Sequence, residues 1–127
     1  MGGMRTVVLT ICIAASAAMA SASTANQQLR DFANCVGRMT AELEHAWLMN
    51  DGDAALLEQQ RAQVAELLAA IMPQDLGRTV LGWRVDARAA QRALLMQASF
   101  APDADDAEWA ASTAAQYRAD CTGFLLS

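Results

Sequence analysis

The sequence predicts an all-α domain. The expected architecture is an antiparallel up-down-up-down four-helix bundle, which follows a cleaved N-terminal signal peptide and has its first and last helices joined by a disulfide. Three observations predict it: four segments repeat apolar residues at helical spacing, short turn sequences separate the segments, and the first and last segments each contain one cysteine. Short connections favour antiparallel neighbours, which leads to the bundle.

Residues 1–22 have the regions of a secretory signal peptide. One positive charge, Arg5, precedes an apolar run of small residues over 6–18, and Ala18-Met19-Ala20 and Ala20-Ser21-Ala22 both fit a small-x-small cleavage site. The run is shorter than the ~20 residues that a membrane span needs. We therefore expect a periplasmic or secreted protein without membrane contact after cleavage, folded as a single helical domain over 23–127.

The first helix of the mature chain is expected over residues 27–49 and is the most clearly amphipathic segment. Its apolar arc consists of Leu29, Phe32, Ala33, Val36, Met39, Leu43, Ala46 and Trp47. Trp47 is accordingly expected to anchor the core, whereas Glu42 and His45 fall outside the arc and are expected in solvent. The cluster Asn50-Asp51-Gly52-Asp53 ends the helix.

The second helix is expected to begin after a cap at Asp53 or Asp51 and to end near Met72, because Pro73 cannot continue it. Its apolar face repeats every seven residues and is widened by neighbouring leucines, giving the set Leu56, Leu57, Val64, Leu67, Leu68 and Ile71.

The third helix is expected over 75–99, with a seam of apolar residues alternately four and three apart that includes Trp83 as a core anchor. Ala87 and Ala90 form a shallow spot on this seam, which we expect a large side chain such as Trp47 to fill. The fourth helix follows the turn at Pro102, begins among acidic residues and buries a face that includes Tyr117 as a core anchor.

The cysteines predict one structural disulfide. Cys12 is lost with the signal peptide, which leaves Cys35 and Cys121 as a pair in an oxidising compartment. At 1.5 Å per residue, both lie roughly 8 to 12 Å from the same end of the expected bundle. The bond would close a loop of about 87 residues, worth about 4.5 kcal/mol in the chain-entropy model. A redox-active pair is disfavoured because no C-x-x-C motif is present.

The composition disfavours several functions. The net charge is −5, which becomes −6 when Arg5 is removed, so nucleic acid and anionic lipid are poor partners. No lysine occurs, which excludes Schiff-base chemistry by a lysine of this chain. Motifs for a serine hydrolase, a phosphate-binding loop, a zinc site or covalent haem are also missing. We therefore expect no enzyme activity and no cofactor.

The single histidine gives only weak candidates for a metal site. Glu42 and His45 have the Glu-x-x-His spacing of di-metal helical bundles, but such sites need a second motif and two further carboxylates. His45 and Met49 lie one turn apart as possible soft ligands for copper, without a third ligand in the sequence.

Two features are candidates for an interaction surface. Arg84, Arg88 and Arg92 form a row on the third helix, suited to an anionic ligand or an acidic partner, or else to ordinary pairing with carboxylates in solvent. Trp109 lies opposite the buried face of the fourth helix, and tryptophan is enriched at interfaces. The sequence thus predicts an exported, non-enzymatic binding module, chaperone-like in one version, that contacts an unknown protein or itself. The alternative is a ligand- or metal-binding helical bundle.

Overall fold

The computed structural model describes the backbone of residues 9–126 and the side chains of residues 24–126. Over this range the chain forms α1 (Leu9–Leu48), α2 (Ala54–Ile71), the short 3-10 turn η1 (Gln74–Leu76), α3 (Gly77–Phe100) and α4 (Ala104–Gly123), without a strand. The predicted all-α class with four helices is confirmed. Residues 1–8 of the predicted signal peptide lie outside the described residues.

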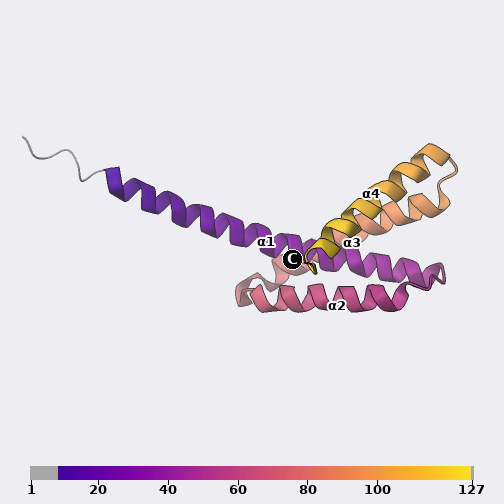
Figure 1. Ribbon diagram of the computed structural model, residues 1–127, viewed down its shortest axis with the longest axis horizontal. Coiled ribbons are helices and arrows are strands. Elements are labelled where there is room, and N and C mark those ends of the chain that lie inside the picture. Colours follow the sequence, from indigo (N-terminus) through magenta and orange to yellow (C-terminus); the bar gives the residue numbers. More distant parts are fainter. Residues whose placement is uncertain (1–8, 127) are drawn as a thin grey trace, which may run out of the picture.

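Helix α1 begins well before the expected start at residue 27. Its first half is rich in alanine, the residue with the highest helix propensity, so the backbone continues as a helix through the predicted cleavage sites at Ala20 and Ala22. Figure 1 shows this N-terminal half extending beyond the other three helices. The folded part of the chain therefore gathers around the second half of α1.

The ends of the other elements follow local sequence chemistry. Asn50 takes a left-handed φ of 54° in the turn after α1, and α2 ends before Pro73. Asp103 caps α4: its Oδ1 accepts hydrogen bonds from the backbone N–H groups of Asp105 (2.9 Å) and Asp106 (3.0 Å). Turn residues thus placed these boundaries correctly to within one or two residues. The predicted cap of α2 is wrong: the Asp53 side chain accepts no hydrogen bond from the helix, and Asp51 Oδ1 accepts one only from the Asp53 N–H, before α2 begins.

The helices are not arranged as a square bundle. α1 makes its most extensive contact with α3, then with α2, and a smaller one with α4, while α2 packs almost entirely on α1. The α3–α4 hairpin diverges from the α1–α2 pair, as Figure 1 shows. An up-down-up-down square would instead put α1 and α3 on a diagonal. The predicted bundle arrangement is therefore not confirmed.

A close crossing of α1 and α3 explains this difference. Gly37 has no side chain, and the backbone of α3 around Ala87 lies directly against it. The expectation that Trp47 fills a shallow spot at Ala87 and Ala90 is wrong. The α1 backbone at Gly37 packs directly against Ala87, and Ala90 is exposed to solvent. Small residues here bring two backbones together instead of receiving a large side chain.

The core lies between α1 and its three neighbours. Its fully buried large side chains are Met39, Leu57, Gln91, Val36, Val64, Val80 and Cys121. Of the apolar face expected on α2, only Leu57, Val64 and Leu68 are buried, because α2 has one neighbour and needs only one narrow stripe.

The three aromatic anchors expected in the core differ in position. Trp83 is partly buried and packs against the core. Trp47 is 60% exposed, so its assignment as an anchor is wrong: it lies in the last turn of α1, where the α3–α4 hairpin has already diverged. Tyr117 is 37% exposed and lies at the surface, with the Arg38 guanidinium 4.0 Å from its ring centre. That assignment is also wrong.

Candidate functional site

The disulfide fastens the end of α4 to the middle of α1. Cys35 and Cys121 are bonded, with α-carbons 5.3 Å apart, and both are buried. Phe32 and Phe124 pack edge to face beside them, with ring centres 5.0 Å apart. The predicted pairing is confirmed, and both sulfurs lie within the hydrophobic core.

A buried layer of polar groups lies about two helical turns away from the disulfide. Glu42 follows Cys35 by seven residues on α1, and Ala114 precedes Cys121 by seven on α4, so this layer repeats the geometry of the disulfide layer. Between them lies Gln91 of α3, whose Nε2 donates to Glu42 Oε1 (2.7 Å) and to the Ala114 carbonyl oxygen (3.1 Å). One amide therefore ties three helices together.

Glu42 corrects an expectation from the sequence. It is 7% exposed, not solvated, because α3 and α4 cover the side of α1 that carries it. The sequence contained a usable indication: a partner helix bonded to Cys35 must also face the residue two turns further along. Gln91, 1% exposed, was not singled out at all, since a single glutamine in a polar row has no distinctive spacing.

A groove opens beside this polar layer, between α1, α3 and α4. Its volume is about 430 Å³, and five alanines of α3 and α4 form part of its wall. The polar groups along it are Glu42, His45, Ser99, Arg118 and Thr122. His45 Nε2 lies 2.9 Å from Ser99 Oγ, which joins α1 to the end of α3 at one border.

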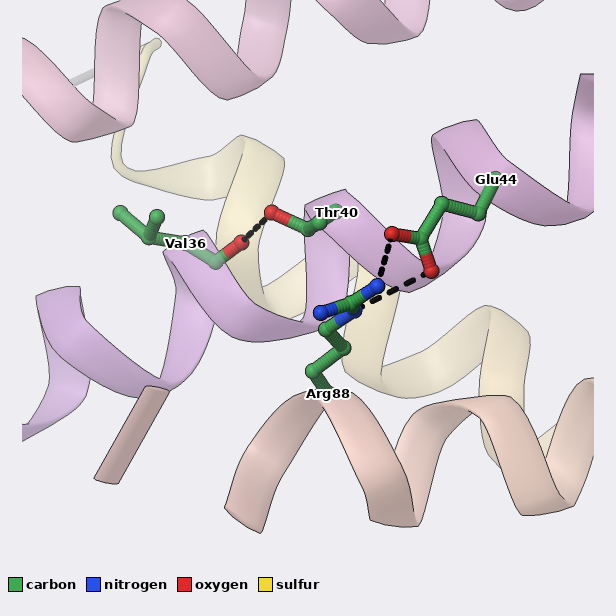
Figure 2. A network of polar contacts seen from close by, with 4 residues as sticks. All are labelled: Val36, Thr40, Glu44 and Arg88. Atoms are coloured by element: carbon green, nitrogen blue, oxygen red, sulfur yellow. Dashed lines mark hydrogen bonds and ion pairs between the residues drawn. The ribbon is translucent and has the colours of Figure 1, made fainter. Parts of the chain in front are cut away.

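The three arginines of the predicted row have different surroundings. Arg88 contacts Glu44 of α1 through two nitrogens, with Nε 3.1 Å from Oε2 (Figure 2). Thr40, one turn earlier on α1, donates instead to the Val36 carbonyl oxygen at 2.7 Å. Arg84 is partly buried and Arg92 is exposed. Since both partners of the ion pair are partly in solvent, we assign it less than about 1 kcal/mol.

The weak metal candidates are not brought together. His45 lies against Ser99, whereas Met49 is 48% exposed in the turn after α1. Between residues 24 and 126, no group of three or more His, Cys, Asp or Glu side chains is placed to hold a metal ion.

Large apolar side chains are exposed on every helix. Trp109, as expected for a candidate contact residue, is 59% exposed on α4. Trp47 and Leu48 at the end of α1 and Met49 just after it are also exposed. Leu56, Leu67 and Ile71 lie within about 60° of one another around α2 and form what we call the outer α2 stripe. Leu81 and Val85 on α3 and Phe100 at its end are exposed as well.

None of the described helices combines the length and the hydropathy required to cross a bilayer. No family model matches the chain, and neither a curated protein nor a solved structure matches it significantly.

Proposed function

We propose that this protein is an exported, non-enzymatic interaction module that binds another protein, or a second copy of itself, through exposed apolar helix faces. The observation that supports it best is the outer α2 stripe. Leu56, Leu67 and Ile71 are between 38 and 49% exposed although they lie on a folded helix. A helix that packs on one neighbour only leaves such a stripe available. A chaperone-like holdase is one version of this function.

Export is the second half of the proposal. It is supported by the regions of residues 1–22 and by a buried disulfide, which is stable in an oxidising compartment. We expect the mature chain to begin after Ala20 or Ala22, so that α1 starts close to Leu29, the first buried residue among the described side chains. Fractionation followed by N-terminal sequencing tests this: a cytoplasmic protein that keeps residues 1–22 contradicts it.

The binding half is tested with an unfolding client protein monitored by light scattering, together with sedimentation of the protein alone. The triple variant Leu56→Ser/Leu67→Ser/Ile71→Ser should lose client protection or self-association. The matched control is Gln59→Ser/Gln63→Ser/Glu66→Ser, three exposed polar positions on the same helix, which should behave as wild type. A monomeric wild-type protein that protects no client would overturn the proposal.

A further inference from the structure

The groove between α1, α3 and α4 contains a carboxylate that the protein does not neutralise. Glu42 is 7% exposed, and its only hydrogen bond among residues 24–126 comes from the neutral Gln91 amide. The one ion pair in that range joins Arg88 to Glu44. A carboxylate that is largely shielded from water and has no cationic partner is unfavourable, so a cationic group entering the groove would be stabilised beside Glu42.

A guanidinium without a counter-ion lies along the same groove. Arg118 of α4 is partly buried, and no hydrogen bond or ion pair to it occurs within the described part of the chain. Arg118 and Glu42 both line the groove but are not within ion-pair distance of each other. The groove therefore presents one site for a positive group and a separate site for a negative group.

Apart from the polar side chains of His45, Ser99 and Thr122, the rest of the wall is apolar. Leu95, Ala98, Ala111, Ala115 and Ala119 leave room that larger side chains would fill. The volume of about 430 Å³ lies within the range of roughly 300–1,000 Å³ typical of small-molecule sites. Such a wall accommodates the hydrocarbon part of a ligand whose charged ends meet the two side chains.

We propose that this groove binds a small zwitterion with an apolar body, of the class formed by apolar amino acids and short apolar peptides. The ammonium group pairs with Glu42, the carboxylate pairs with Arg118, and the side chain lies on the alanine wall. Charge-assisted hydrogen bonds at both ends give the site its selectivity. This ligand site is separate from the outer α2 stripe, so it stands or falls independently of the proposed partner binding.

Isothermal titration calorimetry on the oxidised mature protein tests the site with leucine and dileucine, which distinguish a free amino acid from a peptide. Two half-probes follow: 3-methylbutylamine has only the ammonium group, and 4-methylpentanoate has only the carboxylate. We expect Glu42→Gln and Arg118→Gln each to weaken zwitterion binding by about tenfold or more, the loss of one charge-assisted contact. Arg78→Gln and Glu66→Gln, exposed and outside the groove, are the matched controls and should bind as wild type.

The half-probes separate this site from non-specific charge effects. Arg118→Gln should abolish binding of the carboxylate probe and leave the amine probe unchanged, and Glu42→Gln should do the reverse. Glu42→Gln keeps the acceptor for Gln91; if it nevertheless fails to fold by circular dichroism, Arg118→Gln and the two probes decide. Absence of binding to wild type up to about 10 mM ligand, or equal binding by wild type and Arg118→Gln, overturns the proposal.

Discussion

Gly37 of α1 and Ala87 of α3 lie at the point where the two helices come closest. A β-carbon added to Gly37 would be 3.1 Å from the β-carbon of Ala87 and 3.0 Å from the backbone nitrogen of Arg88, and it would overlap the carbonyl oxygen of Arg84. Any side chain at position 37 therefore forces the helices apart. The absence of a side chain at Gly37 therefore sets how closely α3 can approach α1 at this crossing.

Gly37→Ala should destabilise the protein by about 1–3 kcal/mol in urea denaturation, because overpacking against backbone outweighs the gain in helix propensity. Gly82→Ala is the control: it lies inside α3 with nothing within 4 Å of the added β-carbon, and it should stabilise by about 0.5–1 kcal/mol. Equal effects of the two substitutions would mean that the helices do not approach closely at Gly37.

Removal of the disulfide should lower the free energy of unfolding by about 2–5 kcal/mol, because Cys35 and Cys121 close a loop spanning 86 positions. The measurement compares Cys35→Ser/Cys121→Ser with oxidised wild type in urea. Wild type under a reductant strong enough to open the buried bond should match the double variant. A loss below about 1 kcal/mol would show that α4 is held to α1 by other contacts.

The hydrogen bond between Gln91 and Glu42 should appear as an energetic coupling. Gln91→Leu leaves the Glu42 carboxylate buried without a donor, while it also removes the Gln91 Oε1 atom, which has no hydrogen-bond partner among the described residues. A double-mutant cycle with Glu42→Leu should give a coupling of about 1–2 kcal/mol. Strict additivity would place Glu42 in solvent after all.

Burial, not residue size, should decide the effect of truncating side chains on α1. Met39→Ala removes a side chain with 0% exposure and should destabilise by about 2–5 kcal/mol. Trp47→Ala removes a larger side chain that is 60% exposed, and the change should stay within about 0.5 kcal/mol. Thermal and urea unfolding of the two variants check this, and a large loss from Trp47→Ala would restore it to the core.

The sequence was sufficient for the features that depend on local chemistry. Helix type, the stop at Pro73, the acidic start of α4 and the pairing of the two cysteines each rest on spacing or on a residue with one strong preference. These preferences act within a few residues, or through a covalent bond, so they do not require knowledge of the tertiary arrangement.

Features that depend on which helices are neighbours were not predicted. The sequence prediction for α1 assumed a single buried side. Three helices pack around α1 in the structure, and they also cover Glu42. Gly37 was not singled out, because in sequence a glycine inside a helix indicates only a low helix propensity. In the structure it permits the close crossing of α1 and α3. The candidate groove depends on that crossing and on the divergence of α4, and neither has a pattern in the sequence.

The disulfide between the middle of α1 and the end of α4 can form only late in the synthesis of the folded region, because its two cysteines are 86 positions apart. Synthesis must pass residue 121 before Cys35 can form this bond, and until then the Cys35 thiol can pair with a wrong thiol. A product that stops before residue 121 keeps the Cys35 thiol unpaired and lacks the covalent link between α4 and α1.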